Sequence, residues 1–235
     1  MKKILSIFVV FASVLAFAGC FNPLQKATNN TNNTNNTVVN PVEEKTETKS
    51  NDTINATTKK KVDVNLNEDY FFMIKNNKFK AGDKISNIAS VGLKQDSRVV
   101  DQKIGKNTYL IGGGTIYNSD DKSVLNITPF NASDEEITAK DAVIGGFEIG
   151  SYDYDSIENE VLDLDISIVG GIKLGSTYEE VTSVFGTTDN TYYAESLGYT
   201  VYTFKSDKVY RSFEITVDKN NKVSRIKWQN LEFAR

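Results

Sequence analysis

The chain has no histidine, one cysteine and three prolines in 235 residues. The absence of histidine excludes Ser-His-Asp and Cys-His catalysis and any histidine-ligated zinc site. A single cysteine excludes an intrachain disulfide, a four-cysteine metal site and an iron–sulfur cluster. The chemistry that remains belongs to carboxylates, lysines, tyrosines, hydroxyls and amides, and we expect no cofactor.

The single cysteine follows an apolar leader. Lys2 and Lys3 precede an almost unbroken apolar run over residues 4–17, which ends at Ala18-Gly19-Cys20. A membrane span needs about 20 apolar residues, so a run of this length is typical of a secretory signal. The Ala-Gly-Cys ending resembles the lipobox of bacterial lipoproteins, although Phe17 stands where that family usually has leucine.

The lipobox resemblance implies a lipid anchor. It implies that a diacylglyceryl group is attached to Cys20, that residues 1–19 are removed as a signal peptide, and that the mature chain is held on the outer face of a bacterial cell membrane. The alternative is an ordinary secreted protein cleaved after Ala16-Phe17-Ala18, which leaves Cys20 as a stray thiol.

Residues 20–62 are polar and repetitive. A three-residue Asn-Asn-Thr repeat over 29–37 continues into a Glu/Lys/Thr/Asn mixture that ends in Lys59-Lys60-Lys61. A segment with so few large apolar residues cannot bury enough surface to offset the entropy of ordering, so we predict a disordered tether.

Charge argues against a nucleic-acid partner. The whole chain has a net charge of −4, and the leader and the tether carry an excess of lysine, so the remaining domain is more acidic still. An acidic domain is disfavoured on polyphosphate and on anionic lipid. We therefore expect contact with the membrane only through the acyl group on Cys20.

The rest of the chain contains an internal similarity. Residues 79–91 align without gaps on residues 172–184, with lysine, glycine, serine and valine recurring and the apolar positions matching. We predict two tandem α+β repeats, 63–155 and 156–235, each a short hairpin and a helix packed on a mostly antiparallel sheet of three or four strands.

Local signals define each predicted copy. The hairpin turns are expected at Asn76-Asn77 and Gly170-Gly171, because both pairs tolerate positive φ. The helices are expected to begin at Asp83 and at Ser176, the second with a capping-box pattern to Glu179, and to end at a glycine in each copy. The closing glycines are Gly92 and Gly186.

Strands are predicted after each helix. Their expected ranges are 108–117, 123–130 and 142–149 in the first copy, and 199–204, 209–217 and 223–228 in the second, with a turn at Ser206-Asp207. Gly112-Gly113-Gly114 lies inside the first of these strands. No Gly-Lys-Ser/Thr follows it, so it predicts a bulge or bend and not a phosphate-binding loop.

The second copy carries a family resemblance. The run from Gly171 to Val181, followed by Phe185-Gly186 and three strands, resembles the helix-then-sheet module of the β-lactamase-inhibitor-protein-like family and of SmpA/BamE-type outer-membrane assembly lipoproteins. The resemblance implies the fold and the use of a sheet face for protein–protein contacts, and it assigns no binding residue. A capped helix alone also accounts for the motif.

Two groups of residues are candidate sites. Aromatic residues in or beside the second copy's strands could anchor a partner or could simply fill the sheet; they are Tyr192, Tyr193, Tyr199, Tyr202, Tyr210 and Trp228. Asp153 and Asp155 begin the densest acidic run and are weak candidates for a Ca²⁺ site. The EF-hand pattern fails there, and a solvated acidic linker is the favoured interpretation.

We therefore expect a lipid-anchored extracytoplasmic interaction module with a protein or envelope partner, and no enzyme. The alternative is a solute- or metal-binding lipoprotein with a site between the repeats. A carboxylate-based hydrolase is disfavoured, because nothing in the spacing selects a pair of carboxylates.

Overall fold

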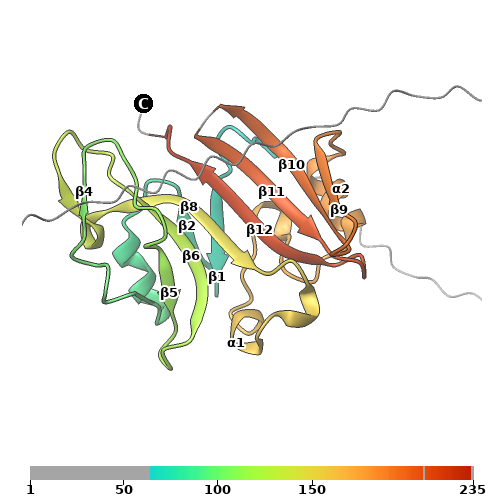
Figure 1. Cartoon of the computed structure of the whole chain (residues 1–235), viewed down its shortest axis with the longest axis horizontal. Coiled ribbons are helices and arrows are strands. Elements are labelled where there is room, and N and C mark those ends of the chain that lie inside the picture. Colours follow the sequence, from blue (N-terminus) through green and yellow to red (C-terminus); the bar gives the residue numbers. More distant parts are fainter. Residues whose placement is uncertain (1–63, 209, 234–235) are drawn as a thin grey trace, which may run out of the picture. The chain divides into compact units, whose positions relative to one another are not determined.

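The computed structural model describes residues 64–208 and 210–233. The expected signal peptide, Cys20 and the tether lie outside these residues. Within them, an antiparallel eight-stranded sheet has the order β3-β5-β6-β8-β12-β11-β10-β9 (Figure 1). The strand bounds in that order are Lys94–Gln95, Thr115–Tyr117, Ser123–Phe130, Val143–Gly150, Val223–Asn230, Arg211–Val217, Tyr199–Lys208 and Thr191–Ala194.

Smaller elements complete an α+β fold that is mostly sheet. They are the hairpin β1 (Phe71–Ile74) and β2 (Asn77–Lys80), the pair β4 (Lys103–Ile104) and β7 (Ile137–Thr138), and the helices η1 (Ile85–Val91), η2 (Ala139–Asp141), η3 (Tyr154–Ser156), α1 (Asn159–Leu162), η4 (Val169–Gly171) and α2 (Tyr178–Phe185). The α+β class is the one expected from the sequence.

The large sheet has one face buried by the protein's own elements, which we call the packed face. Phe147 of β8 and Trp228 of β12 are register partners on it, and both are almost fully buried. Phe72 of β1 stacks on Phe147 with ring centroids 4.4 Å apart, and Phe185 of α2 packs on Phe213 of β11 at 5.2 Å. Because side chains alternate along a strand, the residues between these project from the opposite side, the open face.

The helix α2 begins one residue later than the sequence pattern indicates. The capping box is formed by Thr177 and Glu180: the Glu180 N–H donates to Thr177 Oγ1 at 3.3 Å, and the Thr177 N–H donates to Glu180 Oε2 at 3.0 Å. Ser176 Oγ instead accepts from the Lys173 N–H. The helix ends at Gly186 with φ 76°, as expected.

The predicted first helix is the short 3₁₀ helix η1, and Asp83 does not begin it. Lys84 is the N-cap and makes no side-chain cap, since an ammonium has no acceptor, and the Asp83 carboxylate accepts from the Lys80 N–H at 2.9 Å. The carboxylate therefore closes the turn after β2 and leaves the helix uncapped. Gly92 ends the helix in the left-handed region, with φ 80°, as expected.

The first hairpin turn also differs by one residue. Ile74 pairs with Asn77, so Lys75 and Asn76 form the two-residue loop, with φ of 46° and 69°. Two positive φ values give the turn that matches the twist of a hairpin. Gly170 and Gly171 both have positive φ, as expected, but they lie within η4 in a wider turn.

Two of the predicted strands differ from the structure. The strand expected over 108–117 is interrupted: Tyr109 forms an isolated bridge with Phe130, and the chain joins the sheet again at Thr115 after the three glycines. The bend expected at the glycines is therefore present. β10 extends through Lys208, so the turn expected at Ser206-Asp207 lies within a strand that has two register shifts.

Candidate interaction face and its hollow

Rows of side chains cross the open face, aligned by the strand register. In the central row, Glu148 of β8 is opposite Lys227 of β12, and Lys227 is opposite Glu214 of β11. The next row places Gly146 of β8 opposite Gln229 of β12. The centre of this face is therefore polar, with charges of alternating sign.

One end of the open face is covered by a small cluster. Arg225 Nε donates to Glu148 Oε1 at 2.8 Å, and its Nη2 lies 2.7 Å from the same oxygen. The Arg225 guanidinium also lies over the ring of Tyr152 at 4.9 Å, and Tyr152 stacks on Tyr199 with ring centroids 4.5 Å apart. This cluster leaves Thr216 only 1 % exposed.

A hollow of about 310 Å³ lies beside that cluster, where β6, β8 and β12 meet the glycine-rich segment. Its lining includes Asn126, Thr128, Glu148, Lys227 and Gln229. Gly114 lines it, and Gly146 lies between the lining residues Thr128 and Gln229 in the strand register. A Cβ on Gly146 would lie 2.7 Å from Thr128 Oγ1, and one on Gly114 would lie 1.4 Å from the Ile127 carbonyl oxygen. Side chains at those positions would close the hollow or separate the strands.

Three side chains of the hollow lack partners among residues 64–208 and 210–233. The Lys227 ammonium forms no ion pair there, and neither the Gln229 amide nor the Thr128 hydroxyl forms a hydrogen bond with a described residue. By contrast, Asn126 accepts from the Thr115 hydroxyl at 3.2 Å. The hollow therefore presents donors that no described residue accepts from.

The segment beside the hollow carries an exposed apolar residue. Ile111 is 82 % exposed and precedes the three glycines, and its neighbour Leu110 lines the hollow with Gly112. Gly112 has φ 72°, a region that favours glycine. The triple glycine, which the sequence predicts as a bend, thus forms one edge of the hollow.

The aromatic residues expected to contact a partner are spread over different environments. Trp228 is 1 % exposed on the packed face, and Tyr202 stacks on Tyr178 of α2 at 4.3 Å, so neither belongs to a free surface. Tyr199 is buried under Tyr152. Tyr193 and Tyr210 are 62 % and 37 % exposed.

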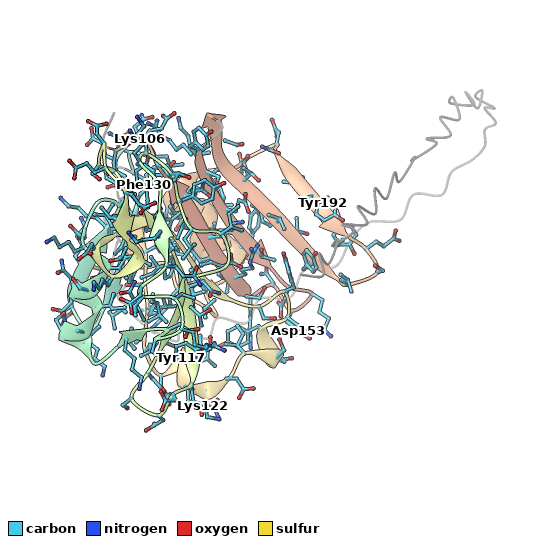
Figure 2. All side chains as sticks on the ribbon, turned by 60° about the vertical axis from the view of Figure 1, so that its left-hand side comes forward. Lys106, Tyr117, Lys122, Phe130, Asp153 and Tyr192 are labelled. Atoms are coloured by element: carbon cyan, nitrogen blue, oxygen red, sulfur yellow. The ribbon has the colours of Figure 1, made fainter. Side chains whose placement is uncertain are left out.

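Two further tyrosines are exposed: Tyr192, which is among the aromatic residues singled out from the sequence, and Tyr152, which the sequence pattern does not single out. Tyr192 is 63 % exposed on the edge strand β9 (Figure 2), and Tyr152 is 46 % exposed in the segment after β8. Tyr192 is the register partner of Val201, which places it on the open face, whereas Tyr193 points to the packed side. Only the strand parity of 191–194 could have separated the two.

The acidic candidates Asp153 and Asp155 accept hydrogen bonds from other groups of the protein. Asp153 Oδ1 accepts from the Asp155 N–H at 3.1 Å and caps η3, and Asp155 accepts from the Asn220 side chain at 3.4 Å. Among residues 64–208 and 210–233, no group of three acidic or sulfur side chains is placed to hold a metal ion.

The clearest electrostatic perturbation lies away from the hollow. Arg98 donates from Nε to Asp96 Oδ1 at 2.9 Å and from Nη2 to Asp96 Oδ2 at 2.6 Å, and these bonds lower the pKa of Asp96 to about 2. Arg98 also reaches the Tyr117 hydroxyl at 3.1 Å. These contacts link the segment after β3 to Tyr117 of β5 at the edge of the sheet.

Comparisons with known proteins return nothing that assigns a family. No family model, no curated protein and no solved structure matches the chain. In the part of the chain that the structure describes, no helix has the length and apolar character required to cross a bilayer.

Proposed function

We propose that the chain is a lipid-anchored extracytoplasmic protein whose open face is an interaction surface for a protein or other envelope partner. One observation carries the proposal. The packed face of the large sheet is buried by β1, β2 and α2, whereas on the open face Lys227, Gln229 and Thr128 have no partner among the described residues around the hollow. Such donors are hydrated in the free protein and can exchange water for a partner's acceptors on binding.

We also propose that the described residues contain a tandem repeat, with the boundary between residues 155 and 156. The strand order supports it, because β3, β5, β6 and β8 run inward from one edge as β9, β10, β11 and β12 run inward from the other. The last strands of the two copies, β8 and β12, then pair at the centre of the sheet (Figure 1). Each copy also has a helix closed by a glycine, Gly92 or Gly186.

The proposed anchor rests on the sequence, since Cys20 lies outside the described residues. The test is metabolic labelling of the bacterium with a clickable palmitate analogue, followed by fractionation. The wild-type chain should carry the label and sediment with membranes, and a Cys20→Ser variant should carry none and leave the membrane fraction. An unlabelled wild-type chain would refute the anchor.

The proposed surface is tested by site-specific photo-crosslinking in intact cells. A photoreactive amino acid at Gln229 on the open face should give a discrete adduct with an envelope component. The matched control is Asn87, which is exposed on η1. Absence of an adduct at Gln229, or an equal yield of the same adduct at Asn87, would refute the open face as the interaction surface.

A further inference from the structure

The geometry of the hollow over Gly146 points to a carboxylate-binding site, and we propose that it receives an acidic side chain, Asp or Glu, of a polypeptide partner. This inference rests on the proposed function, because it names the chemical group that the partner presents to the open face. It concerns Lys227, Gln229 and Thr128, which no contact within the described residues explains.

The charges around Lys227 favour an anionic ligand. Lys227 has a glutamate on each side in its row, Glu148 and Glu214. Arg225 makes two polar contacts to Oε1 of Glu148, so the charge of that carboxylate is offset from the other side. Glu214 does not line the hollow. The ammonium of Lys227 is thus the one cation without an ion partner among the described residues that line the hollow.

The hydrogen-bond donors of the hollow also favour a carboxylate. Lys227 offers only donors, the Gln229 amide offers two N–H groups, and the Thr128 hydroxyl offers one. A carboxylate is an acceptor-only group with about four lone-pair positions, so it can satisfy all three side chains together. The bond to the ammonium would be charge-assisted and correspondingly stronger than a neutral hydrogen bond.

The shape of the hollow also fits a side chain carried by a polypeptide. The missing side chain at Gly146 opens the space between Thr128 and Gln229, since a Cβ there would lie 2.7 Å from Thr128 Oγ1. The hollow of about 310 Å³ is at the small end of ligand sites, which bury most of their ligand's surface. A side chain carried by a docked polypeptide brings its own surrounding surface to cover the rim, beside the exposed Ile111.

The charge count also selects the anion. Phosphate groups carry nearly two charges and are recognised by arginine forks or clusters of cations. Here Lys227 is the only lysine or arginine among the described residues of the lining; Arg225 lies outside it and is engaged by Glu148. A single charge on the ligand matches a single ammonium.

The test is an NMR titration of the full-length chain in a non-ionic detergent, observing the amides of Gly146, Thr128 and Gln229. The probes are acetyl-aspartate N-methylamide, its asparagine counterpart, succinate and inorganic phosphate. We expect saturable shifts at these amides with the aspartate probe, and no saturation with the asparagine probe over the same range.

Matched variants make the test specific. Lys227→Met should weaken binding of the aspartate probe by about tenfold or more. Lys122→Met, which removes another exposed lysine at the β5–β6 turn (Figure 2), should leave binding unchanged. The amide spectrum of each variant verifies that it is folded.

Equal binding of the aspartate and asparagine probes, or binding unchanged by Lys227→Met, would overturn the carboxylate site. Tighter binding of phosphate would overturn the anion assigned, and tighter binding of succinate would overturn the assignment to a partner's side chain. An adduct at Gln229 without binding of the aspartate probe would refute this inference alone. Binding of the aspartate probe without an adduct would refute the proposed interaction surface, and with it the assignment to a partner's side chain, and would leave only a carboxylate site.

Discussion

The two faces of the large sheet are built from the same strands and follow different chemistry. On β12, Trp228 faces inward and is 1 % exposed, and it packs on Phe147 and Phe72. The residues on either side of it, Lys227 and Gln229, face outward without partners among the described residues. The stacked rings of the packed face stabilise the fold, whereas the polar side chains of the open face remain available for binding.

The largest expected effect compares neighbours on opposite faces. Trp228→Ala should lower the free energy of unfolding by about 3–5 kcal/mol, because it leaves a cavity among the stacked rings. Gln229→Ala should change it by less than about 0.5 kcal/mol. Urea unfolding of both variants checks this, and a comparable loss for Gln229→Ala would mean that the open face also stabilises the fold.

The next effect concerns the space at Gly146. Gly146→Ala should destabilise the fold by about 1–2 kcal/mol, because the new Cβ meets Thr128 Oγ1. Combining it with Thr128→Ala should recover part of that loss, and a double-mutant cycle measures the coupling. Additive losses would show that the two positions do not share the hollow.

A smaller effect is expected at the helix that covers the packed face. Thr177→Ala removes the cap of α2 and should cost about 1 kcal/mol of unfolding free energy. Lys84→Ala, at the uncapped start of η1, should cost less than about 0.5 kcal/mol. Thermal melts of the two variants check the difference, and equal costs would remove the distinction between the helices.

The smallest effect depends on pH at the β3 edge. Folding lowers the pKa of Asp96 from 3.8 to about 2, so its contribution is present above about pH 4 and is lost as the pH falls toward 2. Asp96→Asn should therefore melt below the wild-type chain at pH 6 and approach it near pH 2. A difference in melting temperature that stays constant across this range would contradict the role of Arg98.

The sequence predicts local structure better than it predicts faces. The strand at Ser123–Phe130 has the bounds expected from its pattern, and Gly186 ends α2 where expected. The starts of the helices differ because the expected capping side chains accept from upstream backbone N–H groups instead: Asp83 accepts from Lys80 and Ser176 from Lys173. Thr177 caps α2 in place of Ser176.

Long-range register explains what the sequence could not give. The pairing of β8 with β12 places Gly146 opposite Gln229 and Glu148 opposite Lys227, and no local pattern contains that information. The same register turns Trp228 inward. The hollow is thus a product of strand pairing between segments about 80 residues apart, whereas the triple glycine at its edge is predicted from the sequence as a bend.

The claim that the open face is the interaction surface is tested most directly by the ratio of photo-crosslinked adduct at Gln229 to adduct at Asn87, in intact cells and at equal amounts of chain. We expect a discrete adduct at Gln229 and little or none at Asn87. A ratio near one, or no adduct at Gln229, would contradict it.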